Sequence, residues 1–107
     1  MPMFLAQKKC IPCDKGASAL SPQEAQVLLG NLSGWTISDK WLKKSYKFKN
    51  FVQALTFVNK VGEVAEGENH HPDMELGWGY VNIRLQTHSV GGLHENDFIL
   101  AAKIDAL

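Results

Sequence analysis

Tyr80-Val81-Asn82-Ile83-Arg84-Leu85-Gln86-Thr87-His88 alternates between apolar side chains and side chains that tolerate water. Successive side chains of a β-strand point to opposite faces, so this pattern predicts a strand with one covered face. Val81, Ile83 and Leu85 would face a core, whereas His88 would lie on the polar face, toward solvent or a cleft. A strand of this kind needs a second layer that covers its apolar face.

The residues from Asn50 to about Glu66 are suited to form that layer. Apolar or small side chains recur there at steps of three and four residues, which predicts a helix with one apolar stripe: Phe51, Ala54, Leu55, Val58, Val61, Gly62 and Ala65. Asn50 suits the helix N-cap, and Gly67 is expected to end the helix because glycine readily adopts the left-handed conformation found there.

Further segments complete the order of elements. Ser21-Pro22-Gln23-Glu24 has the form of a capping box with proline at the first helical position, and Gly30-Asn31 is expected to end this helix. Residues 34–38 and 41–48 alternate on either side of a turn, which predicts a β-hairpin. A short strand at 74–76 and a final helix at about 95–106 follow.

The expected order is therefore helix, strand, strand, helix, strand, strand, helix. This order predicts the α+β class: a two-layer sandwich in which helices cover one face of a four-stranded antiparallel sheet. A chain of 107 residues fits one domain. We expect residues 1–20 to form a partly ordered N-terminal arm, because proline and glycine interrupt any period there, and residues 21–107 to form the single domain.

Charge and hydropathy exclude several classes of partner. The chain has 11 basic and 11 acidic residues, so no net charge draws it to nucleic acid or to an anionic membrane. No apolar run approaches the ~20 residues of a membrane-spanning helix, and the N-terminus lacks the pattern of a secretory signal. We expect a soluble, cytoplasmic protein that binds neither nucleic acid nor membrane.

Cys10 and Cys13 form a lone C-x-x-C motif near the N-terminus. Two cysteines cannot make a disulfide framework, and a zinc site needs two further ligands that do not lie nearby in sequence. A thioredoxin-like role would require a βαβ context, which the predicted order lacks. We therefore expect no metal at this motif.

Three histidines are the strongest chemical signal. His70 and His71 are adjacent in Glu68-Asn69-His70-His71-Pro72, and His88 ends the predicted strand. An imidazole titrates near pH ~6.5, so it can both give and take a proton under cellular conditions. Pro72 favours extended backbone at His71, and in extended backbone the two histidines point to opposite sides.

Each histidine also has a structural explanation. The pair could cap a helix C-terminus, where cations meet the helix dipole, and His88 alone could be a solvated strand residue. Glu66 lies four residues before His70, so its carboxylate could orient an imidazole unless Gly67 ends the helix first. His94 stands at the start of the last helix and is expected to be structural, with Asp97 aiding that helix start.

The combined pattern resembles that of a known family. The residues that carry the resemblance are Gly34-Trp35, Glu66, His70-His71-Pro72, Thr87-His88, Gly92-Leu93, Asp97, Leu100-Ala101 and Ile104-Asp105. They look like the pattern of the pterin-4a-carbinolamine dehydratases, also known in animals as the dimerisation cofactor of a homeodomain transcription factor. The resemblance spans about residues 20–105.

The resemblance implies a dehydration of 4a-hydroxytetrahydropterin to quinonoid dihydropterin and water, which recycles the pterin used by aromatic amino acid hydroxylases. It implies a catalytic set of His70, His71 and His88, with supporting or substrate-binding roles for Glu66, Pro72 and Thr87. It also implies a homodimer or homotetramer, and neither a metal nor another cofactor is expected.

We expect His71 to be the main acid/base because Pro72 fixes its direction, His70 to assist, and His88 to bind and polarise the pterin. The alternative is a non-catalytic binding or assembly module, such as a transcriptional coactivator or protein-assembly factor, that keeps the same fold. Retention of all three histidines favours the enzyme, since a scaffold does not need them.

Overall fold

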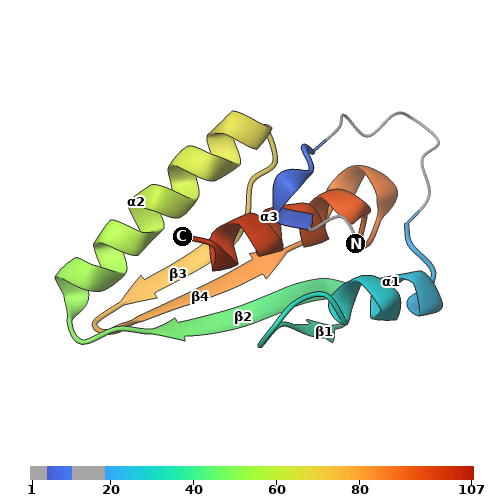
Figure 1. Cartoon of the computed structure of the whole chain (residues 1–107). Helices are drawn as coiled ribbons and strands as arrows, with labels where there is room; N and C mark the ends of the chain where they lie inside the picture. Colours follow the sequence, from blue (N-terminus) through green and yellow to red (C-terminus); the bar gives the residue numbers. More distant parts are fainter. Residues whose placement is uncertain (1–4, 11–18) are drawn as a thin grey trace.

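The computed structural model describes residues 5–10 and 19–107 of the chain (Figure 1). Its elements, in chain order, are η1 (Leu5–Gln7), α1 (Pro22–Leu29), β1 (Thr36–Ser38), β2 (Trp41–Lys47), α2 (Phe51–Glu68), β3 (Asp73–Gly77), β4 (Tyr80–Leu85), η2 (His88–Val90) and α3 (Glu95–Asp105). None of the helices in these residues is long and apolar enough to cross a membrane.

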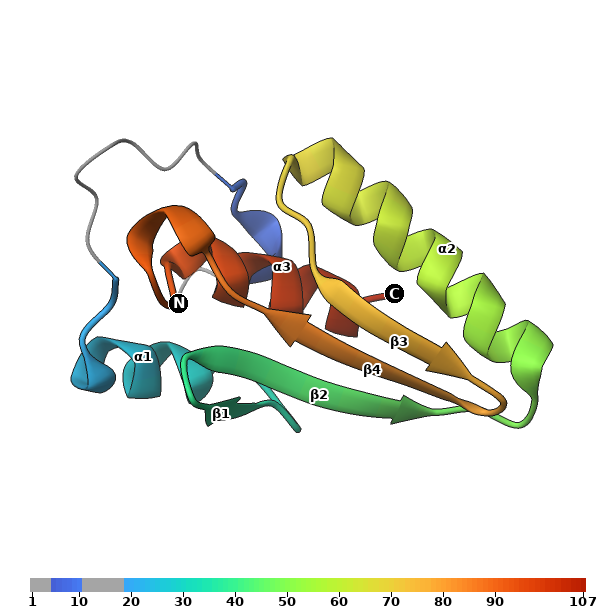
Figure 2. The same cartoon turned by 180° about the vertical axis from the view of Figure 1, so that it is seen from behind.

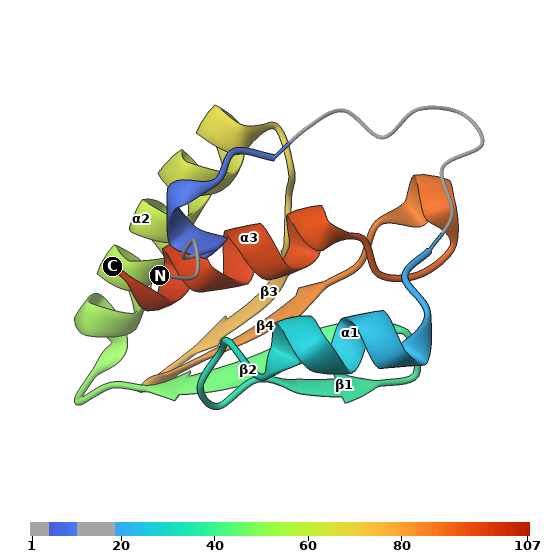
Figure 3. The ribbon, with the colours of Figure 1, turned by 45° about the vertical axis from the view of Figure 1, so that its right-hand side comes forward.

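The strands form one antiparallel sheet in the order β1-β2-β4-β3, and they follow one another across it in Figure 2. The helices lie together on one side of this sheet, as Figure 3 shows from the side. The predicted α+β class, the two-layer sandwich and the four-stranded antiparallel sheet are confirmed.

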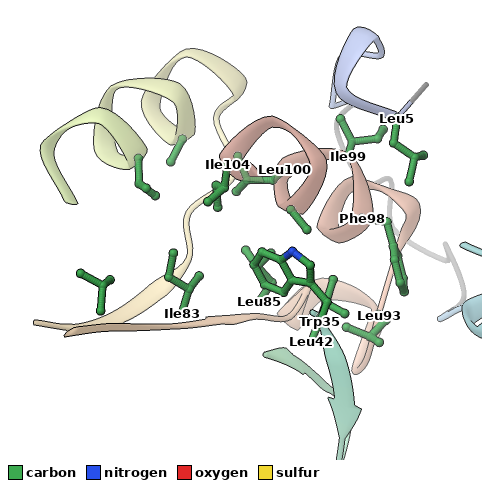
Figure 4. Close-up of a cluster of buried hydrophobic side chains, with 14 of the residues drawn as sticks. Leu5, Trp35, Leu42, Ile83, Leu85, Leu93, Phe98, Ile99, Leu100 and Ile104 are labelled. Carbon is green, nitrogen blue, oxygen red and sulfur yellow. The ribbon is translucent and has the colours of Figure 1, made fainter. Parts of the chain in front are cut away.

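The core lies between the sheet and α3. Leu42 of β2 and the alternating β4 residues Val81, Ile83 and Leu85 are buried, as the sequence pattern predicts. They meet the α3 side chains Phe98, Leu100 and Ile104, which are fully buried as well (Figure 4). Each such side chain stabilises the fold by roughly 1.5–3 kcal/mol through burial alone.

Two predicted boundaries are wrong, and both affect the histidines. α2 does not end at Gly67 but continues to Glu68, and Asn69 adopts the left-handed conformation that ends it (φ 53°, ψ 39°). A glycine inside a helix costs only about 1 kcal/mol, which the packing of α2 offsets. β4 ends at Leu85, so His88 does not lie in a strand but opens the short helix η2.

Part of the predicted N-terminal arm packs on the domain. Leu5 is buried with the core, and Lys8 pairs with Glu95 at the start of α3 at 2.7 Å. Near the other end of the arm, the Leu20 backbone N–H donates to the Leu93 carbonyl at 2.8 Å. Residues 1–4 and 11–18 lie outside the described residues, so the division into an arm (1–20) and a domain (21–107) stays a prediction.

The carboxylate of Glu24 is expected to titrate below its usual range. The Ser21 backbone N–H donates to it at 2.9 Å, which favours the ionised form and lowers the pKa of Glu24. A lowered folded-state pKa means that this contact stabilises the fold above the unfolded pKa, and that the stabilisation is lost as the pH falls through the folded value. Chemical denaturation at several pH values should show that the free energy of unfolding differs between wild type and Glu24→Gln, and that this difference shrinks toward acid pH. A difference that stays constant with pH would contradict the contact.

Candidate functional site

The end of α2 fixes the direction of the histidine pair. Asn69 is left-handed, and its backbone N–H donates to the Glu66 carbonyl at 3.2 Å. The His70 backbone N–H donates to the Ala65 carbonyl at 3.1 Å, which completes the helix cap. The backbone of His70 is therefore part of the cap, while its side chain is left for another contact.

The His70 imidazole reaches a buried carboxylate. Its Nε2 lies 2.6 Å from Oδ1 of Asp97, whose side chain is fully buried at the start of α3. The other oxygen of Asp97 accepts from Thr87 Oγ1 at 2.9 Å and from the His94 backbone N–H at 3.0 Å. A carboxylate buried away from water is tolerated because these three donors replace its hydration.

This contact sets the tautomer of His70. An ionised carboxylate can only accept, so the proton of a neutral His70 sits on Nε2 and the lone pair is on Nδ1. The ring is also held on a rigid partner, since Asp97 cannot move without breaking its contacts to Thr87 and His94. The arrangement can therefore accept a proton at one defined nitrogen.

The His71 imidazole points to a different carboxylate. Its Nε2 lies 2.6 Å from Oε1 of Glu66 on the last turn of α2. The sequence predicts that Glu66 orients an imidazole, and it does so for His71, not for His70 at the fourth position. This pair is open to water, because the side chains of His71 and Glu66 are 56% and 80% exposed, whereas that of His70 is 13% exposed.

Pro72 lies directly between His71 and the first residue of β3. A proline fixes its own backbone and restricts the residue before it, so the chain leaves the helix cap and enters the sheet in one extended path. The side chains of His70 and His71 contact different carboxylates, Asp97 and Glu66.

His88 is placed by a turn and not by a strand. Thr87 forms an isolated bridge with Gly92, and the residues between them make η2 and its left-handed end at Gly91. The exposed His88 ring meets the half-buried Trp41 ring edge to face, with centroids 6.1 Å apart. Its neighbour Thr87 contacts Asp97, but the contact of the His88 ring itself is with Trp41 and not with Asp97 or His70.

Asp97 therefore joins His70 to Thr87, whereas His71 and His88 each have a separate partner, Glu66 and Trp41. Asp97 is the candidate site residue that the sequence places only at a helix start, although it belongs to the residues that carry the resemblance. His94 also does more than expected at that start, because its Nδ1 accepts from the Asn96 backbone N–H at 3.0 Å and caps α3. Within the described residues, no group of three or more potential metal ligands gathers.

Cys10 is expected to react slowly with alkylating reagents. Burial, together with the nearby Glu68 carboxylate, raises the pKa of its thiol to about 12. The thiolate is the nucleophile, so in a Cys13→Ser variant Cys10 should react with iodoacetamide at pH 8 about 10³-fold more slowly in the folded than in the unfolded protein. Equal rates in buffer and in denaturant would contradict this burial. Cys13 itself lies outside the described residues.

Comparison with known proteins gives a consistent result. The family model described as "Pterin 4 alpha carbinolamine dehydratase" matches residues 18–107. A protein of Halorhodospira halophila is 50% identical over 98% of each chain, and one of Methylococcus capsulatus is 49% identical over 96% of this chain and 92% of its own. Both are named provisionally as pterin-4-alpha-carbinolamine dehydratases.

Two solved structures are similar as well. One, titled a transcriptional coactivator/pterin dehydratase from Brucella melitensis, is 33% identical with a TM-score of 0.79 over 83% of this chain and 97% of its own. The other, titled a pterin dehydratase-like protein that is a RuBisCO assembly factor in the alpha-carboxysome, is 27% identical with a TM-score of 0.56 over 67% of this chain and 83% of its own. On the family match and these identities, the chain belongs to the pterin 4 alpha carbinolamine dehydratase family.

Proposed function

We propose that this protein dehydrates 4a-hydroxytetrahydropterin to quinonoid dihydropterin and water by histidine acid/base catalysis. One observation carries the proposal: two adjacent imidazoles each bind their own carboxylate through Nε2 at 2.6 Å. Such pairs fix both the orientation and the proton position of an imidazole, which is what proton transfer at neutral pH requires. Family membership supplies the substrate class.

The reaction needs one proton delivered and one removed. A proton goes to the 4a-hydroxyl, the C4a–O bond breaks and water leaves, while N5 of the pterin loses its proton and its electron pair forms the new C=N bond. In the proposal His71 is the main acid/base, His70 assists at the second proton position, and His88 binds and polarises the ring. Glu66 orients His71, and Pro72 and Thr87 hold the histidines in place.

The proposed reaction recycles the pterin cofactor of aromatic amino acid hydroxylases, so such an enzyme is the proposed source of the substrate. We also propose a homodimer or homotetramer. The support is the open sheet, whose outer strands β1 and β3 each have one edge that no described residue of the chain pairs with. Sedimentation at micromolar concentration tests this, and a monomer would count against strand pairing between subunits.

A second candidate is a non-catalytic assembly or coactivator module. The titles of the two similar structures favour it, since one names a RuBisCO assembly factor and the other a transcriptional coactivator. A module of this kind would keep its partner binding when the histidines are replaced, because the histidines lie at the end of α2 and in η2 and not in the core.

The experiment is a coupled assay with freshly generated 4a-hydroxytetrahydropterin. Wild type should accelerate dehydration well above buffer, and the His70→Ala/His71→Ala/His88→Ala triple variant should not. His94→Asn is the matched control, because it removes a histidine while asparagine still caps α3. No acceleration by wild type, with an intact fold by circular dichroism, would refute the dehydratase and favour the module.

A further inference from the structure

The sheet face turned away from the helices carries a hollow that the proposed chemistry does not use. Its volume is about 400 Å³, and it is lined by Gly34, Thr36, Lys43, Lys44, Ser45, Glu75, Asn82, Ile83 and Arg84. Four of these residues alternate with the core residues of β2 and β4 and so point to the opposite side of the sheet: Lys43, Ser45, Asn82 and Arg84. The question is what such a polar hollow would bind.

Two of its cations form no ion pair within the described residues. Lys43 and Arg84 are direct partners in the ladder of β2 and β4, where like charges oppose each other at a cost. Lys44 is committed elsewhere, since its Nζ binds Asp105 at 2.8 Å. On its other side Arg84 faces Asp73 of β3, but among residues 5–10 and 19–107 neither Lys43 nor Arg84 has a carboxylate oxygen within 4.0 Å. An anion between them would relieve their repulsion.

Aromatic contacts connect this hollow to the histidines. The Arg84 guanidinium carbon lies 4.6 Å from the centroid of the Trp41 ring, and the same ring lies 6.1 Å from the His88 ring. The guanidinium and the His88 imidazole are therefore no further apart than these two distances together. Arg84 leans over Trp41, toward the end of the sheet where the histidines lie.

The register of β3 and β4 places Asp73 opposite Arg84, and His71 precedes Asp73 by two residues in the chain. Asp73 is the first residue of β3, so the row of Arg84 is the row of this ladder nearest in sequence to the histidine pair.

We propose that Lys43 and Arg84 form a subsite for an anionic group, phosphate ester or carboxylate, on the side chain of the pterin substrate. The inference rests on the proposed function for the identity of the ring, but the anion site itself does not. The guanidinium offers several fixed donors and Lys43 adds a second charge. The Thr36 hydroxyl lies at the rim as a further donor.

Glu75 also lines the hollow and would repel an anion at its end. Its Oε1 accepts from Asn82 at 3.1 Å, and Asn82 in turn accepts from Ser45 Oγ at 2.6 Å. This row of side chains lies one step further from His71 than the row of Lys43 and Arg84. The anion is therefore confined to the row of Lys43 and Arg84, on the side of Arg84 away from Asp73.

The first test needs no catalysis. Inorganic phosphate is titrated into the protein, and the amide signals and the Arg84 Nε–H signal are followed by NMR. Phosphate should shift the NMR signals of Lys43 and Arg84. Arg84→Gln and Lys43→Gln should each weaken phosphate binding about tenfold or more. Lys47→Gln is the matched control, because Lys47 lies on the same strand face beside Tyr80 (5.7 Å) and should have little effect. Unchanged affinity in Arg84→Gln and Lys43→Gln would overturn the subsite.

The second test compares substrates. The KM of wild type should be about tenfold lower for 4a-hydroxytetrahydropterins with a phosphate or a glutamate side chain than for one with a neutral polyol. Arg84→Gln and Lys43→Gln should remove that advantage with kcat unchanged. Equal KM values for all three substrates would refute the subsite and leave the dehydratase standing. If none is converted, the proposed function fails and the phosphate titration alone decides the subsite.

Discussion

Replacing Asp97 by asparagine is expected to slow dehydration by about 10²-fold or more while the fold is kept. The asparagine oxygen can still accept from the Thr87 hydroxyl and the His94 backbone N–H, the two donors that contact Oδ2 of Asp97 in the wild type. Its amide nitrogen then faces His70 Nε2 and can only donate. His70 must accept at Nε2 and carry its proton on Nδ1, so the nitrogen that should take a proton is blocked.

The measurements are kcat and the His70 tautomer by nitrogen NMR. Thr87→Val is the control, because it removes one contact to Asp97 without changing what faces His70. It should lower the free energy of unfolding by about 1 kcal/mol and reduce kcat much less. Asp97→Ala removes the acceptor altogether and should cost about 3–5 kcal/mol, since three buried donors lose their partner. Wild-type kcat in Asp97→Asn would remove this residue from the mechanism.

Sequence patterns predict most of this fold because its elements are regular. The apolar stripe of α2 and the alternation of β4 each depend on spacing within one element. The alternation of β4 matches the observed burial, and so do Ala54, Val61 and Ala65 of α2, but Phe51 and Leu55 of the predicted stripe are exposed. The capping box at Ser21 and Glu24 is present with both its hydrogen bonds. Local patterns of this kind need no knowledge of the rest of the chain.

The two boundary errors show where local patterns fail. Gly67 has the intrinsic preference of a helix end, but α2 continues through it to Glu68, and Asn69, two residues later, supplies the left-handed residue. The alternation that predicts a strand to His88 persists beyond Leu85, although ladder pairing ends there. A side-chain pattern cannot reveal where a strand loses its neighbours.

The site is less predictable than the fold because its contacts are distant in sequence. His70 and Asp97 are 27 residues apart, and only the packing of the α3 start against the sheet end brings them together. The pattern of residue types singles out the three histidines and Glu66. It does not reveal that Glu66 serves His71, because that contact spans the turn formed by Asn69.

Among single histidine variants, His71→Ala is expected to lose the most activity. If its imidazole is the main acid/base, kcat should fall by about 10²–10⁴-fold. His70→Gln keeps a donor for Asp97 but loses the titratable ring, so its kcat should fall less and its stability should change little. His88→Ala should raise KM more than it lowers kcat, because its proposed role is binding.

Variants of Glu66 test the role of His71 further, because Glu66 is its hydrogen-bond partner. Glu66→Gln keeps a side chain that can accept from His71 Nε2 but removes the charge, so its kcat should fall by a smaller factor than that of His71→Ala. The double variant Glu66→Gln/His71→Ala should be no slower than His71→Ala alone, because Glu66 acts only through that ring. If the kcat losses of the two single variants multiplied in the double variant, Glu66 would contact the substrate itself. Equal small losses for all three histidine variants would mean that no imidazole transfers a proton in the slow step.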